Sequence, residues 1–154
     1  MNTNSNSFTP ANFPQTAYLV AGRTVAAVVL GIEVESLRIA DAQPEEWEIT
    51  IKFASKSREA SMEEFAIIEI CGRWAAATVT LGHPISQKNP TTRRGTPPDW
   101  LDKQFVESKA EFIATNYYVT IKQVAEQLKE KRFMNAADIR EAIHDGPAIA
   151  YRVH

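Results

Sequence analysis

The stretch Trp47-Glu-Ile-Thr-Ile-Lys-Phe53 alternates apolar and polar side chains along its whole length. An extended chain with this pattern has one apolar face and one polar face, which is the period of two that a half-buried strand requires. The apolar face would comprise Trp47, Ile49, Ile51 and Phe53. We therefore expect this stretch to be a central strand of an antiparallel sheet that lies against the protein core.

A second apolar run follows this strand after the polar connection 55–61. It begins at Phe65 and reaches Leu81, and its β-branched pair Ile67-Ile68 favours a strand. The same segment also carries a helix signal, because Ser61-Met-Glu-Glu64 is a capping-box pattern and apolar residues follow it at helical spacing. We expect a strand over 61–72 and keep the helix as the alternative.

The segments before Trp47 are expected to complete the sheet. Tyr18–Val20 and Thr24–Leu30 are short β-prone runs, and Ile32–Ile39 alternates acidic and apolar positions. Gly31 would mark a bulge or a kink between two of these strands. Because the connections are short, an antiparallel meander over 17–81 explains the pattern most simply.

The second half of the chain has helical periodicity. Thr96 followed by Pro97 is a typical helix start. Phe105 and Phe112, with Val106 and Ile113 beside them, form one broad apolar face that we expect to cover the sheet. Further helices would be capped by Thr120 and Asn135. We expect a helical half over 97–146 and a short final strand over 148–153.

The predicted fold class is therefore α+β, an antiparallel β-meander followed by a helical C-terminal half that packs on or beside the sheet. At 154 residues the chain fits a single domain. That domain would span 17–154, with a loop over 82–96. The segment 1–16 is rich in Asn, Ser, Thr and Pro, and we expect it to be a flexible arm.

Composition favours a soluble protein of the cytoplasm. Cys71 is the single cysteine, and no charged-then-apolar signal segment opens the chain. The longest apolar run, Val25–Ile32, is much shorter than the roughly 20 residues that a membrane helix needs. A net charge of −2 is far from the basic surface of most nucleic-acid binders. We expect no membrane partner and consider a nucleic-acid partner unlikely.

Three residues at short spacing carry a resemblance to a known family. Glu69, Gly72 and Trp74 follow an alternating strand and a polar turn, and this order resembles the bacterial SecB-like export chaperones over roughly residues 24–81. That resemblance implies a sheet that packs into dimers or tetramers, and grooves that hold unfolded client chains.

No catalytic or metal-binding pattern is present in the sequence. A nucleophile would have to be Cys71, with a base among His83, His144 and His154, but none of them stands in a motif that activates a thiol. These histidines also lack the spacing of zinc ligands. We therefore expect no enzyme activity, no cofactor and no metal.

The aromatic residues favour a protein that binds other proteins, because these side chains supply most of the energy of interfaces. The candidate partner-binding residues are Trp47, Phe53, Arg93, Arg94, Trp74, Trp100 and Phe105. Our leading hypothesis is an oligomeric SecB-like chaperone or adaptor. A small inhibitory or immunity-type protein that blocks a larger complex is the alternative. The second alternative is a DNA-binding regulator that uses a helix-turn-helix-like pair over 120–146.

Overall fold

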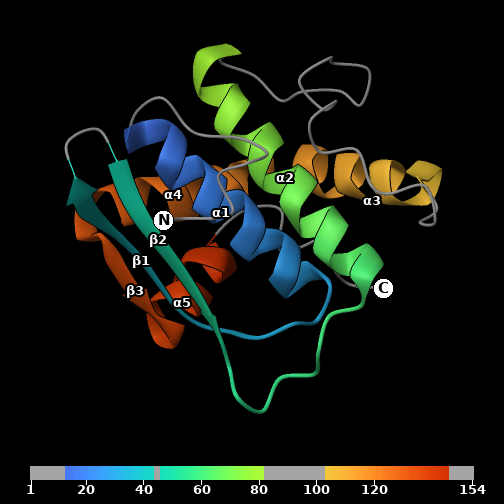
Figure 1. The fold of residues 1–154 in the computed structure, drawn as a ribbon, viewed down its shortest axis with the longest axis horizontal. Helices are drawn as coiled ribbons and strands as arrows, with labels where there is room; N and C mark the ends of the chain where they lie inside the picture. Colours follow the sequence, from blue (N-terminus) through green and yellow to red (C-terminus); the bar gives the residue numbers. More distant parts are fainter. Residues whose placement is uncertain (1–12, 44–45, 82–102, 146–154) are drawn as a thin grey trace.

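A three-stranded antiparallel sheet and five helices make up the fold in the computed structural model (Figure 1), which describes residues 13–43, 46–81 and 103–145. Within this part of the chain, the sheet has the strand order β2-β1-β3. The elements in chain order are α1 (Phe13–Val29), β1 (Val34–Gln43), β2 (Glu46–Phe53), α2 (Met62–Leu81), α3 (Lys103–Asn116), α4 (Tyr118–Lys131), β3 (Phe133–Asn135) and α5 (Ala136–Asp145). The α+β class and the antiparallel sheet are confirmed.

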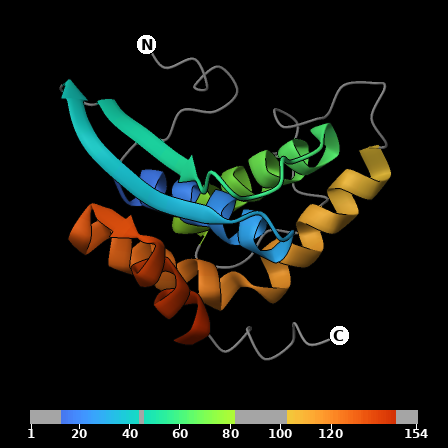
Figure 2. The same cartoon turned by 90° about the horizontal axis from the view of Figure 1, so that it is seen from below.

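The strand predicted from Trp47 to Phe53 is confirmed as β2. It pairs with β1 along its length, from Val34 opposite Phe53 to Gln43 opposite Glu46. The three-residue strand β3, which sequence patterning did not indicate, pairs with the other edge of β1. Figure 2 shows β1 and β2 along one side of the molecule, above α4 and α5. The sheet is thus a two-stranded ribbon extended by a short third strand from the C-terminal half.

The strands predicted before Ile32 are wrong, because this part of the chain forms a helix. Tyr18–Val20 and Thr24–Leu30 belong to α1, and so do residues 13–16 of the expected arm. Every residue from Thr16 to Ala27 is buried. A helix that is covered on all sides needs no polar face, so its apolar residues show no helical period. Such a sequence resembles the continuous apolar runs of buried strands.

Gly31 ends this helix instead of kinking a strand. It has a left-handed φ of 88°, its N–H donates to Val28 O, and the N–H of Ile32 donates to Ala27 O at 2.8 Å. These two hydrogen bonds form a Schellman motif, for which glycine is the favoured residue. The turn directs the chain from α1 into β1.

The strand expected over 61–72 is wrong, because α2 is a helix. The Ser61 hydroxyl accepts a hydrogen bond from the Glu64 N–H at 3.1 Å, and the Ser61 N–H donates to Glu64 Oε1 at 2.9 Å. Arg58 adds two hydrogen bonds to the same carboxylate, at 2.9 and 2.7 Å. This reciprocal cap starts the helix. Packing then outweighs the β preference of Ile67 and Ile68, both of which are buried.

The helices α1 and α2 pack against each other through two glycines. A Cβ atom at Gly22 would lie 2.7 Å from both the Ala75 Cβ and the Cys71 carbonyl oxygen. A Cβ atom at Gly72 would lie 2.7 Å from the Arg23 Cγ. Real side chains do not approach this closely, so the contact requires glycine on both helices. Gly72 is therefore part of the helix contact.

The C-terminal half is helical and contacts the sheet through α5 and α4. The cap predicted at Asn135 is confirmed, since its side chain accepts a hydrogen bond from the Asp138 N–H at 2.9 Å. The cap predicted at Thr120 is wrong: α4 begins at Tyr118, and Thr120 is fully buried inside the helix. The loop 82–96, the start at Thr96 and the strand 148–153 lie outside the described residues.

Replacing Gly22 by alanine tests the close contact of α1 and α2. Alanine favours a helix by about 1 kcal/mol over glycine, yet we expect Gly22→Ala to lower the free energy of unfolding by about 1–3 kcal/mol, because the two helices must separate. Urea denaturation measures the change. Ser108→Ala, at an exposed position of α3, is the control and should change stability by less than about 0.5 kcal/mol. A Gly22→Ala protein as stable as the parent would contradict the close contact.

The cap of α2 predicts a specific dependence of stability on pH. The hydrogen bonds from Arg58 lower the pKa of Glu64 to about 2. A carboxylate whose pKa is lower in the folded than in the unfolded state stabilises the fold above its unfolded pKa. This stabilisation is therefore lost as the pH falls from about 4.5 to about 2.

We expect Glu64→Gln to remove this part of the pH dependence, as measured by urea denaturation between pH 5 and pH 2. The matched control is Glu63→Gln on the same helical turn, because Glu63 has no ion pair within the described part of the chain. An unchanged pH profile for Glu64→Gln would show that the cap contributes nothing.

Candidate protein-binding surface

The predicted partner-binding residues do not form one surface. Trp74 is only 1% exposed and belongs to the core, so a partner cannot reach it. Phe53 at the end of β2 is 37% exposed, and Phe105 on α3 is 49% exposed. Trp47 is half-buried on β2. Trp100, Arg93 and Arg94 lie outside the described residues.

Trp47 is held in a contact that links three elements. Its ring lies 5.0 Å from the ring of Phe13, the first residue of α1. The guanidinium of Arg132 lies over both rings, 4.4 Å from the Phe13 centroid and 5.5 Å from the Trp47 centroid. Cation–π contacts of this kind contribute about 0.5–1 kcal/mol at exposed sites. Trp47 therefore joins β2 to the start of α1 and the end of α4.

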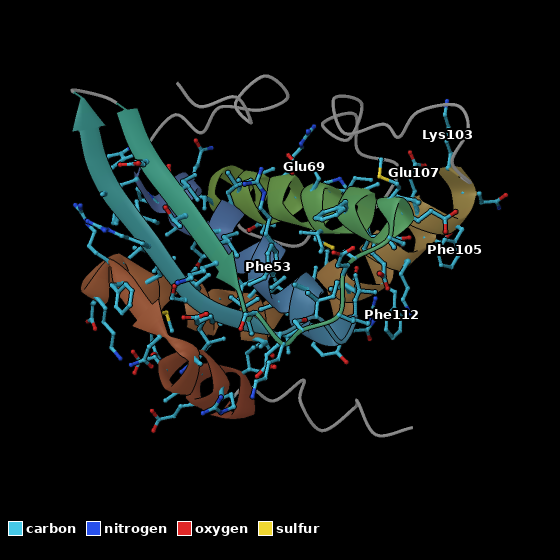
Figure 3. All side chains as sticks on the ribbon, turned by 60° about the horizontal axis from the view of Figure 1, so that its bottom comes forward. Phe53, Glu69, Lys103, Phe105, Glu107 and Phe112 are labelled. Atoms are coloured by element: carbon cyan, nitrogen blue, oxygen red, sulfur yellow. The ribbon has the colours of Figure 1, made fainter. Side chains whose placement is uncertain are left out.

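Large apolar side chains are exposed at one end of the molecule. The N-terminal ends of α2 and α3 lie at this end in both views of the fold (Figures 1 and 2). Figure 3 shows Phe105 and Phe112 on the outer side of α3. We call the following four residues the aromatic end: Met62 (59% exposed), Phe65 (51%), Phe105 (49%) and Phe112 (51%).

The spacing of these residues explains why each pair is exposed together on its own helix. Met62 and Phe65 are three apart on α2, and Phe105 and Phe112 are seven apart on α3, so each pair lies on one helical face. The opposite face of α3 is buried, with Val106, Ala110, Ile113 and Ala114. The expectation that Phe105 and Phe112 cover the sheet is therefore wrong, because the other apolar stripe of α3 packs on the core.

Carboxylates border the aromatic end. Glu63 follows Met62 on α2, and Glu107 follows Phe105 by two residues on α3 (Figure 3). Neither Glu63 nor Glu107 has an ion pair within the described part of the chain. Two cations also lie on α3: Lys103, two residues before Phe105 (Figure 3), and Lys109, whose ammonium lies 5.8 Å from the Phe112 ring centroid. The surface therefore combines exposed apolar side chains with negative charge available to a basic partner.

A largely buried ion cluster holds α2 in place behind this surface. Arg23 of α1 donates a hydrogen bond to Glu69 Oε2 at 2.8 Å, and Arg73 donates to the same oxygen at 3.3 Å. Both arginines are less than 10% exposed. Removing the shared carboxylate would take this hydrogen-bond acceptor from two buried arginines, so the cluster ties α1 firmly to α2.

The three residues of the SecB-like resemblance all lie on α2, not on a strand. Glu69 binds the two buried arginines, Gly72 allows the close approach of α1, and Trp74 fills the core. Their spacing thus follows from helix packing in this chain.

Within the described ranges, the cysteine Cys71 is buried and is not part of this surface. Burial raises the pKa of the Cys71 thiol well above its usual range, and its Sγ lies 3.5 Å from the Ala110 carbonyl oxygen of α3. Among the described residues, no cluster of three or more His, Cys, Asp or Glu side chains could hold a metal ion. No described helix is long and apolar enough to cross a membrane.

The helix pair considered for DNA binding is joined by a strand rather than by a tight turn. Arg132 follows α4 with a left-handed φ of 64°, and the chain then enters β3. Because β3 pairs with β1, the position of α5 is set by the sheet.

The chain matches no protein-family model, and no curated protein matches it significantly. The aromatic end therefore has to be interpreted from its own residues. Sequence reasoning identified Phe105 but missed Met62, Phe65 and Phe112. The only signal for them was a second apolar stripe on each helix, beside the one that packs on the core.

Proposed function

We propose that this chain is a non-enzymatic protein-binding module, a chaperone or adaptor that holds apolar polypeptide segments at the aromatic end. One observation carries the proposal: four large apolar side chains, each about half exposed, lie on the adjoining helices α2 and α3. Scattered apolar residues are normal on protein surfaces, whereas a contiguous apolar patch usually marks a binding site.

The chemistry of the aromatic end suits an extended or partly folded polypeptide. Three phenylalanines provide rigid apolar contact area, and Met62 is flexible enough to adapt to different side chains. The carboxylates of Glu63 and Glu107 would favour segments in which basic residues flank an apolar centre. The preferred ligand is therefore an apolar segment with Lys or Arg on either side.

The resemblance to SecB-like chaperones stays a prediction. Client binding at the aromatic end agrees with what the resemblance implies, but Glu69, Gly72 and Trp74 contribute only to the packing of α2. The inhibitor hypothesis differs in its partner, since it requires one folded protein bound at a fixed ratio.

Two labelled peptides test the proposal. Both have a Leu- and Phe-rich centre, and they carry either Lys and Arg or Asp and Glu at their ends. We expect the full chain to bind the basic peptide more tightly, as measured by fluorescence anisotropy, and the difference to shrink as salt screens the carboxylates. The double variant Phe65→Ser with Phe105→Ser should lose at least about tenfold in affinity, because two aromatic contacts with the bound peptide disappear.

Phe133→Ser is the matched control, since Phe133 is 49% exposed on β3, outside the aromatic end. It should leave peptide binding unchanged. If it weakens binding as much as the double variant, the peptide binds to apolar surface without preference and the aromatic end is not the site. If neither peptide binds, the chaperone proposal fails and a single folded partner becomes the better explanation.

A further inference from the structure

The outer edge of β2 has no strand beside it in the described part of the chain. This strand is eight residues long, contains no proline, and is not shortened or bulged in its middle. Edges of this kind can pair with another chain, and most proteins protect them with proline, bulges or charged side chains, lysine above all. The charges of β2 are of both signs, with Glu48 and Lys52 on either side of Thr50.

The register of the sheet shows which backbone groups point outward. The N–H of Ile39 in β1 donates to Arg132 O beside β3, at 3.0 Å, so the backbone groups of Ile39 point away from β2. Ile39 lies opposite Ile49, and residues in such a non-hydrogen-bonded pair direct their backbone groups away from each other. The N–H and C=O groups of Ile49, and by alternation those of Ile51, therefore face the outer edge.

From this geometry we infer that the edge binds a second copy of the same chain. The two β2 strands pair antiparallel across a twofold axis at Thr50, which joins the two sheets into one. Ile49 then forms hydrogen-bonded pairs with Ile51 of the second copy, and Trp47 lies opposite Phe53. Thr50 faces itself across the axis.

Charge complementarity selects this partner and this register. Glu48, Thr50 and Lys52 all lie on the exposed face of β2. In the Thr50-centred register Glu48 lies opposite Lys52 of the other copy, twice by symmetry, in non-hydrogen-bonded pairs whose side chains are closest. Lys52 already lies 3.6 Å from Glu35, whereas Glu48 has no ion pair within the described residues.

The two neighbouring registers fit less well. If the axis passed through Ile49, Glu48 would face Thr50 and would gain no opposite charge. If it passed through Glu48, the two Glu48 carboxylates would face each other and repel. This inference concerns a different surface from the aromatic end, so it does not depend on the proposed function.

A cysteine at the axis tests the register directly. In Thr50→Cys the two thiols would meet in a non-hydrogen-bonded pair, where the Cα atoms lie about 4.5 Å apart, within the range that a disulfide needs. Mild oxidation should give covalent dimers of the full chain on a non-reducing gel. Glu48→Cys is the control and should stay monomeric on the gel, because that position faces Lys52. The native Cys71 is fully buried and does not interfere.

Charge reversal tests the same pairing without a cross-link. Glu48→Lys and Lys52→Glu should each raise the dissociation constant of the dimer at least about fivefold, because two attractive pairs become repulsive. An equimolar mixture of the two variants should form heterodimers, since each Lys then faces a Glu. Sedimentation velocity measures the masses, and circular dichroism checks that both variants fold.

Four results would overturn the inference. The first is a parent chain that stays monomeric at every concentration measured. The second is a dimer that neither charge reversal weakens. The third is a mixture of the two variants that remains monomeric. Efficient cross-linking through Glu48→Cys but not through Thr50→Cys would place the twofold axis elsewhere and would also refute it.

Discussion

The close contact of α1 with α2 is the constraint on which the other features depend. Gly22 and Gly72 let the two helices approach closely, and the Arg23–Glu69 ion pair joins them beside this contact. Because α1 is buried from Thr16 to Ala27, it forms the centre around which α2, α4 and the sheet are placed. The Tyr18 hydroxyl adds a hydrogen bond to Glu126 of α4, at 3.1 Å. The position of α2 in turn brings its first turn to the same end of the molecule as α3.

Local signals predicted part of this fold correctly. The alternation from Trp47 to Phe53 predicted β2, and the Asn135 cap predicted the start of α5. Both signals depend on residues that are neighbours in the sequence. The helix α1 was not predicted, since a helix buried on all sides shows no amphipathic period. For α2 the cap at Ser61 was the correct signal, and the β-branched residues after it were misleading. The strand β3 has three residues and exists only because β1 provides a partner.

The aromatic end shows why a site is harder to predict than a strand. Two apolar stripes run along α3, one through Val106 and Ile113 and the other through Phe105 and Phe112. Both satisfy the helical period, so the sequence alone does not show which stripe packs on the core. The same limit applies to Trp74. Tryptophan is common at interfaces, yet this one is buried in the core. The packing of α3 against α2, α1 and α4 decides which of its sides stays exposed.

Binding of a client at the aromatic end should be visible as local protection of backbone amides. Hydrogen–deuterium exchange of the full chain, with and without a saturating basic-flanked apolar peptide at constant protein concentration, is the most direct measurement. We expect added protection in the first turns of α2 and along α3, near Phe65 and Phe105, and little change in α5. Protection confined to β2 or α5, or no protection at all, would contradict the account.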